Sequence, residues 1–133
     1  MATARGAFDV EMIPEADDEH VEATSLGRFV VKKRFHGDLE GTSEGRMLTG
    51  MTPVTGSAGY VLIERFRGRL RGEPGSFLLQ HFGVLDRGTP RQTVEVIPDS
   101  GTDALSGLTG RMRSRSVEEP HAFEFEYVLP SPR

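Results

Sequence analysis

Apolar and polar residues alternate with a period of two in nearly every segment of the chain between clusters of glycine and proline. This alternation is typical of β-strands that bury one face, because successive side chains of a strand point to opposite sides. No long segment repeats apolar residues with the 3.6-residue period of an amphipathic helix. The pattern therefore predicts an all-β chain with eight strands, at residues 4–12, 25–36, 42–51, 58–70, 76–85, 91–97, 108–116 and 121–129.

The eight predicted strands favour a single domain over residues 1–133, folded as a closed eight-stranded antiparallel β-barrel. Closure removes the exposed edges that an open sheet has to protect. A two-sheet sandwich is the alternative. The acidic segment 14–22 is expected to be a solvated loop, and the segment 98–110 a loop with one short helical turn at 103–106.

Strand parity predicts which polar side chains point into the barrel. An even-numbered turn around 72–75 pairs even positions of 58–70 with odd positions of 76–85, so that Glu64 and His81 both point inward. An odd-numbered turn or a bulge would bring Gln80 inward instead. The alternation also turns Lys33 inward.

The last predicted strand places Phe123, Phe125 and Tyr127 inside and Glu124 and Glu126 outside. A slip of one residue would bury two carboxylates and expose three aromatic rings. The full set of predicted interior side chains is Phe29, Lys33, Tyr60, Leu62, Glu64, Phe66, Phe77, Leu79, His81, Phe123, Phe125 and Tyr127, with His121 as a further candidate.

Glu64 is the candidate with the clearest chemistry, because its neighbours on the same face are apolar. Desolvation predicts a raised pKa for this carboxyl group unless Lys33 or His81 holds it ionised. With a raised pKa, Glu64 would act as an acid or base with His81 as partner, and Lys33 or Tyr127 would stabilise an oxyanion. The alternative is a buried Glu64–Lys33 or Glu64–His81 pair that does no chemistry.

Composition excludes several classes of protein. The net charge of −4 argues against a nucleic-acid partner. No apolar run reaches the roughly 20 residues of a membrane-spanning helix, and no signal peptide is recognised at the start. The lack of cysteine excludes disulfides and thiolate sites and is compatible with the cytoplasm, which is our expectation for the location.

No cofactor or metal is expected. The four histidines lack the His-x-His and His-Glu-x-x-His spacings of metal sites, although an inward Glu64, His81 and His121 would be one conceivable set. The glycine-rich segment 100–110 has neither the P-loop nor the dinucleotide fingerprint, and no Gly-x-Ser-x-Gly elbow occurs.

Four segments, spaced in order along the chain, resemble a bacterial family of unknown function. They are FHGDLEG at 35–41, ERFRG at 64–68, GSFLLQH at 75–81 and PDSGTDALSGLTG at 98–110. The resemblance covers nearly the whole chain, and Asp99 stands where the family's loop is expected to have glycine. It implies a fold similar to the allene oxide cyclase barrel, which is lipocalin-like in architecture. Plant cyclases of that fold isomerise a fatty-acid epoxide without a cofactor, and bacterial relatives include polyketide cyclases, but a shared fold does not fix a function.

The expected function is therefore the binding of a small amphipathic or hydrophobic molecule, fatty-acid-like or polyketide-like, inside the barrel. The catalytic candidates are Glu64 and His81, and the ligand-binding candidates are Lys33, Tyr60, Phe66, Phe77, Phe123 and Tyr127. Two alternatives are a cofactor-independent cyclase or isomerase in the same cavity, and an interaction module with a filled barrel. Ligand binding and the cyclase or isomerase both require a connected pocket of a few hundred cubic ångströms, whereas the interaction module does not. Whether the chain is an enzyme, and whether it forms a dimer or trimer, stays open at this point.

Overall fold

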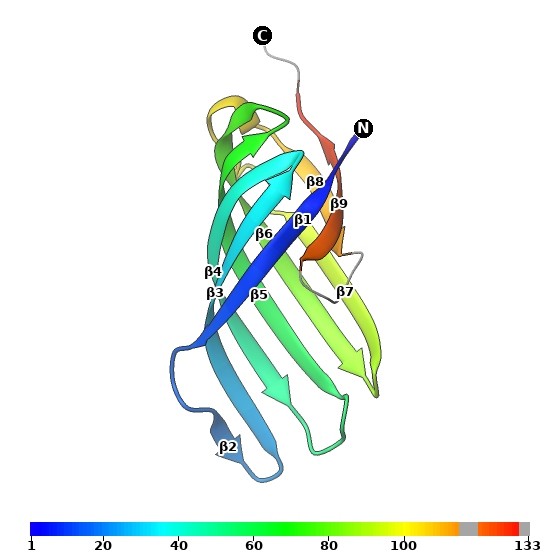
Figure 1. The fold of residues 1–133 in the computed structure, drawn as a ribbon. Helices are drawn as coiled ribbons and strands as arrows, with labels where there is room; N and C mark the ends of the chain where they lie inside the picture. Colours follow the sequence, from blue (N-terminus) through cyan, green and yellow to red (C-terminus); the bar gives the residue numbers. More distant parts are fainter. Residues whose placement is uncertain (115–119, 131–133) are drawn as a thin grey trace.

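The computed structural model describes residues 1–114 and 120–130, which form one antiparallel β-barrel (Figure 1). Its strands are β1 (Ala2–Pro14), β2 (Glu19–Val21), β3 (Thr24–Gly37), β4 (Leu39–Met51), β5 (Ala58–Leu70), β6 (Glu73–Asp86), β7 (Thr89–Val96), β8 (Thr109–Ser114) and β9 (His121–Val128). Each strand from β3 to β9 pairs with the next, and β1 pairs with both β9 and β3, which closes the barrel. The predicted all-β class and eight-stranded barrel are confirmed, with β2 as one extra strand.

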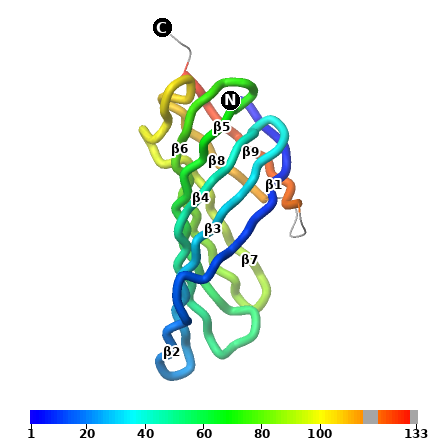
Figure 2. Tube along the Cα trace, turned by 60° about the vertical axis from the view of Figure 1, so that its left-hand side comes forward, coloured from blue at the N-terminus to red at the C-terminus, as the bar shows by residue number. Residues whose placement is uncertain are grey.

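The strand β2 corrects the expectation that segment 14–22 is only a loop. It pairs with the start of β3, with Glu19 opposite Leu26 and Val21 opposite Thr24. All three residues of β2 are exposed, so no alternation of buried and exposed residues marks it in the sequence. In Figures 1 and 2 this hairpin projects from the lower end of the barrel.

Two further segments differ in detail from the expected boundaries. The strand β4 begins at Leu39 rather than at 42, because Leu39 and Glu40 already pair with Leu70 and Arg69 of β5. The pairing of β3 with β4 ends at Phe35 and Gly41, and Gly37 in the connection has a φ of 111°. The helical turn is a short 3₁₀ helix at Asp103–Leu105, close to where it was predicted. Asp99 adopts a φ of 66°, a backbone conformation that favours the glycine expected there. Residues 115 and 116, at the end of the predicted strand 108–116, lie outside the described residues.

The hairpin between β5 and β6 confirms the parity on which the site depends. Its turn has two residues, Arg71 and Gly72, both with positive φ, as a type I′ turn requires. The resulting register places Glu64 opposite Leu79 and Leu62 opposite His81. Glu64 and His81 are consequently both inside the barrel, where they are 1% and 5% exposed.

The register of β9 is also as predicted. The side chains of Phe123, Phe125 and Tyr127 are buried. Glu124 and Glu126 are on the outer side but only partly exposed, and Glu124 lies 3.7 Å from Arg5 of β1. No helix among residues 1–114 and 120–130 is long and apolar enough to cross a membrane.

Aromatic rings fill one half of the barrel, which we call the closed half. Its centre is made of Phe35, Phe66, Phe77, Phe123 and Phe125, with centroids of neighbouring rings 5.0 to 5.9 Å apart. Inward-facing glycines give these rings room, since a Cβ at Gly6 would lie 3.0 Å from the Phe123 ring. The 98–110 loop covers the upper end of the barrel in Figure 1, and two of its own side chains, Leu105 and Leu108, are fully buried.

Candidate functional site

The other half of the barrel, which we call the open half, surrounds a cavity of about 460 Å³. It lies toward the end of the barrel that carries the β4–β5 and β6–β7 connections, the lower end in Figures 1 and 2. Most of its wall is apolar. The lining side chains are Phe8, Val10, Met12, Val31, Lys33, Met47, Thr49, Met51, Ala58, Gly59, Tyr60, Leu62, His81, Val84, Leu85, Pro90, Arg91, Gln92, Val94, Met112, Ser114 and His121.

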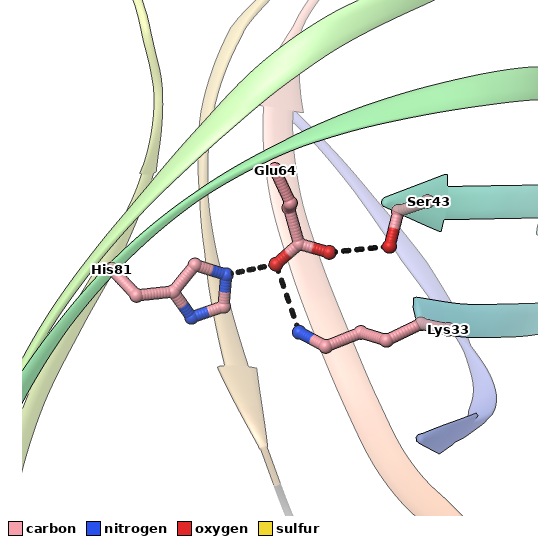
Figure 3. Close-up of polar contacts among 4 residues, drawn as sticks. All are labelled: Lys33, Ser43, Glu64 and His81. Carbon is pink, nitrogen blue, oxygen red and sulfur yellow. Dashed lines mark hydrogen bonds and ion pairs between the residues drawn. The ribbon is translucent and has the colours of Figure 1, made fainter. Parts of the chain in front are cut away.

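A buried polar cluster lies where the open half meets the closed half (Figure 3). At its centre is the carboxylate of Glu64 on β5. The Lys33 Nζ of β3 lies 2.8 Å from Glu64 Oε2, and the Ser43 hydroxyl of β4 donates a hydrogen bond of 2.6 Å to Glu64 Oε1. His81 Nε2 of β6 makes a short hydrogen bond to the same Oε2. Both carboxylate oxygens are therefore satisfied by the protein.

Strand pairing explains how these four side chains meet. Lys33 and Ser43 are directly opposite in the β3–β4 pair. Gly45 faces Glu64 in the β4–β5 pair, and a Cβ there would lie 2.7 Å from the Glu64 Cβ. A larger residue at position 45 would push β4 and Glu64 apart.

The members of the cluster differ in their access to the cavity. Lys33 and His81 belong to its lining, whereas Glu64 and Ser43 do not. The side chain of Glu64 is 0% exposed, compared with 8% for Lys33 and 6% for His81. A ligand in the cavity would therefore contact the lysine and the histidine, with the glutamate behind them.

For Glu64 the structure shows the predicted exception, in which Lys33 and His81 hold the carboxyl group ionised, and not the rise in pKa. Burial does raise this pKa, but the hydrogen bond from His81 and the positive charge of Lys33 outweigh burial and lower the pKa of Glu64 to about 2. The contacts around the carboxylate explain this result, because every partner favours its ionised form. Glu64 is thus a permanent anion near neutral pH and not a proton donor.

The imidazole of His81 is held in its neutral form. Burial lowers the pKa of His81, an effect only partly opposed by the hydrogen bond and charge of Glu64. A neutral imidazole that donates from Nε2 to the carboxylate carries its lone pair on Nδ1. Figure 3 shows that this second ring nitrogen points away from Glu64.

Tyr60 of β5 is a further polar group on the cavity wall. Burial raises the pKa of Tyr60, as does the negative charge of Glu64, while a side-chain hydrogen bond with Gln92 lowers it. Its ring lies over Gly83, where a Cβ would collide with the ring carbons. The glycine on β6 thus sets the position of the tyrosine.

The structure brings together only some of the candidates that the sequence suggested. Lys33, Tyr60 and His81 line the cavity, and Glu64 supports two of them. Phe66, Phe77, Phe123 and Tyr127 pack in the closed half and are absent from the cavity lining. Tyr127 stacks on Phe125 with centroids 5.3 Å apart.

Sequence reasoning missed three features of the site. It did not identify Ser43, nor Phe8, whose ring centroid lies 4.9 Å from Lys33 Nζ. It also missed the methionines at 12, 47, 51 and 112, which line the cavity. The alternation of β1 already turned Phe8 and Met12 to the inner face, so this signal was available in the sequence.

No metal centre is found in the part of the chain that the structure describes, where no three histidine, aspartate or glutamate side chains are grouped to hold an ion. His121 lines the cavity but stacks on the ring of Phe8, with centroids 5.0 Å apart, and does not join the Glu64 cluster.

A groove of about 640 Å³ also runs over the outer wall of β1, β3, β4 and β5. Its outward side chains carry mixed charges, such as Lys32, Glu44 and Arg65, and Lys32 lies 3.8 Å from Glu44. These side chains form a solvated, charged strand face. We therefore place the candidate site in the interior cavity, where polar groups are buried and aimed at an apolar space.

Comparison with known proteins supports the fold and leaves the chemistry open. A family model described as "Protein of unknown function (DUF3224)" matches residues 4–127. The chain is similar to a crystal structure of a protein of unknown function of that family from Shewanella oneidensis MR-1, with 44% sequence identity, a TM-score of 0.91 and 99% of each chain covered. No match is found among curated proteins.

Proposed function

The chain belongs to the DUF3224 family, whose function is unknown, and we propose that it binds one small, mainly hydrophobic molecule in the open half of its barrel. The ligand has a fatty-acid-like or polyketide-like skeleton and one polar end. Its apolar part lies among the methionines, and its polar end lies against Lys33, His81 and Tyr60.

The observation that carries this proposal is the cavity itself. Its volume of about 460 Å³ falls within the range of roughly 300–1,000 Å³ common for small-molecule sites. Such sites combine an apolar wall with a few convergent polar groups, which is the composition found here. The four lining methionines are flexible and polarisable, so they adapt to ligands of different shape.

The charges at the inner end of the cavity limit which polar group the ligand can carry there. The positive charge of Lys33 is neutralised by Glu64, and His81 is held neutral. The inner end of the cavity therefore carries donors and acceptors without net charge. A carbonyl or hydroxyl group suits it better than a carboxylate, which would bring an unbalanced negative charge close to Glu64.

The interaction module with a filled barrel is the weaker candidate, because side chains fill only the closed half. Self-association as a dimer or trimer is compatible with either function. Leu48, Val61 and Phe82 form a row of exposed apolar side chains across the outer wall of β4, β5 and β6, and would be covered in an oligomer. Light scattering measures the molar mass of the protein in solution and so distinguishes a monomer from a dimer or trimer. We also keep the cytoplasm as the proposed location.

The proposal is tested with a pair of adjacent substitutions on β4. Thr49 lines the cavity, whereas Leu48 beside it points outward and is 55% exposed. We expect Thr49→Trp to fill part of the cavity and to weaken binding of decan-2-one at least tenfold in titration calorimetry. Leu48→Trp, the control, should bind like the natural protein.

Native mass spectrometry of freshly purified protein provides the second arm, because a tightly held natural ligand would co-purify. If no small molecule co-purifies and decan-2-one, decan-1-ol and decanoic acid all fail to bind, the proposed function is wrong. Equal binding by the two tryptophan variants would show that the ligand binds outside the cavity.

A further inference from the structure

We propose that His81 is a general base that moves a proton between two carbon atoms of a bound ketone, while Lys33 stabilises the negative charge on the carbonyl oxygen. The inference rests on the proposed function, because the ketone has to occupy the same cavity. It assigns the protein a reaction class, the cofactor-independent shift of a carbon–carbon double bond.

The orientation of His81 is the first argument. Its Nε2 is bound to Glu64, so the neutral ring has its basic lone pair on Nδ1. Nδ1 has no hydrogen-bond partner among residues 1–114 and 120–130. Within the same residues, every fully buried side-chain nitrogen or oxygen has a partner. Nδ1 must therefore reach accessible space, and the accessible space beside His81 is the cavity.

The environment of Glu64 is the second argument, because it excludes this residue as the base. Its side chain is 0% exposed, does not line the cavity, and has both oxygens occupied by Lys33, Ser43 and His81. Its role is to position the imidazole and to fix its tautomer. A carboxylate behind a histidine also stabilises the imidazolium that forms during proton transfer.

Lys33 supplies the third argument. The ammonium group of Lys33 has three N–H donors. One of them binds a carboxylate oxygen, Glu64 Oε2. Because Lys33 also lines the cavity, at least one donor can face a ligand oxygen. His81 and Lys33 bind the same carboxylate oxygen, so base and oxyanion donor lie on the same side of the bound ketone.

The reaction balances within these groups. His81 Nδ1 takes a proton from the carbon between the carbonyl and the double bond of a β,γ-unsaturated ketone. The electrons of the broken C–H bond form a dienolate whose oxygen is held by Lys33 Nζ. The imidazolium then returns the proton to the γ-carbon, and the double bond moves into conjugation with the carbonyl. No oxidant, reductant or second substrate is consumed.

The direct test uses non-4-en-2-one as the probe. The natural protein should convert it to the conjugated non-3-en-2-one, seen as a growing ultraviolet absorbance, and should introduce deuterium at the γ-carbon in heavy water. His81→Gln keeps a donor for Glu64 but removes the base, and we expect the rate to fall at least about 100-fold. His20→Gln on the exposed strand β2 is the matched control and should leave the rate unchanged.

His121 is the competing base, since it lines the same cavity. A rate that survives His81→Gln but is lost in His121→Gln overturns the proposal. Binding of decan-2-one without any conversion of the probe would overturn it as well, while leaving the proposed function intact. Failure of both ketones to bind would instead count against the proposed function.

The role of Glu64 has its own readout. Nitrogen-15 NMR of the natural protein should show His81 as the neutral tautomer protonated at Nε2, a result that needs no variant to fold. In Glu64→Gln we expect kcat to fall by at least tenfold with little change in KM, and the tautomer signal to change. A tautomer protonated at Nδ1 in the natural protein would contradict the assignment of the base.

Discussion

The two halves of this barrel are built from the same strands, yet one is packed with side chains and the other is hollow. In the closed half, phenylalanine rings face inward against glycines. In the open half, methionines and aliphatic side chains, together with the rings of Phe8, Tyr60 and His121, line a cavity of about 460 Å³. The period-two pattern is the same in both. Side-chain volume at inward positions, and not the backbone, decides which half can receive a ligand.

The strand β5 crosses the boundary between the halves. Its inward residues run from Leu62 in the open half through Glu64 to Phe66 in the closed half. The polar cluster therefore lies between a packed core and an apolar cavity. Because the closed half is rigidly packed, it fixes the geometry of the groups that the open half presents to a ligand.

The largest expected effect comes from breaking the cluster at this boundary. Lys33→Met removes the ammonium and leaves the buried Glu64 carboxylate with two neutral partners. We expect a loss of about 3–5 kcal/mol in the free energy of unfolding. Lys32→Met is the control, since Lys32 is exposed and 3.8 Å from Glu44, and should cost at most about 1 kcal/mol. Urea unfolding measures both, and equal losses would contradict a buried ionised pair.

A matched leucine pair compares the two halves directly. Leu79 is fully buried in the closed half, whereas Leu62 lines the cavity. Leu79→Ala should destabilise the protein by about 2–5 kcal/mol, because it opens a new void in a packed core. Leu62→Ala should cost clearly less, since it enlarges a cavity that already exists. If the leucine beside the cavity proves the costlier of the two, the division into halves is wrong.

Acid should weaken the fold through the cluster at the boundary. The pKa of His81 lies below its ordinary 6.5 in the folded state, so the unfolded chain takes up this proton first and stability falls as the pH drops below about 6.5. The pKa of Glu64 is about 2 against an ordinary 4.5, so its contribution is complete above 4.5 and is lost as the pH falls toward 2. Urea unfolding across this range should show both losses of stability. The His81→Gln variant should lack the loss that begins below about pH 6.5.

The smallest effect is expected from a change that touches only the cavity wall. A Cβ at Gly83 would collide with the Tyr60 ring, whereas one at Gly50 would meet nothing within 4 Å. Gly83→Ala should cost about 1–3 kcal/mol and weaken binding of decan-2-one, because the ring is pushed from its position. Gly50→Ala should leave binding unchanged. Equal binding by the two alanine variants would show that the position of Tyr60 does not matter.

Strand alternation predicted most of this fold because most strands bury one face. The inward positions of Glu64, His81 and Lys33 followed from parity and a two-residue hairpin turn. The strand β2 could not be found in this way, since all of its residues are exposed. Parity tells which side a residue faces and says little about its height along the barrel.

Height along the barrel explains what the sequence left undecided at the site. Phe66 and Tyr60 face inward on the same strand, but only Tyr60 reaches the cavity. The pKa of Glu64 likewise depends on how near His81 and Lys33 come. The β3–β4 pairing ends at Phe35 and Gly41 and places Lys33 opposite Ser43, a register that the glycine-rich segment 37–41 did not specify.

The methionines offer the most direct measurement of whether the open half is a binding site. The chain has five of them. Met12, Met47, Met51 and Met112 line the cavity, and Met1 is 89% exposed at the terminus. In methyl NMR of protein labelled at methionine, decan-2-one should shift the four cavity signals and leave that of Met1 in place. Cavity signals that stay unchanged at saturating ligand, or a shift confined to Met1, would contradict a ligand site inside the barrel.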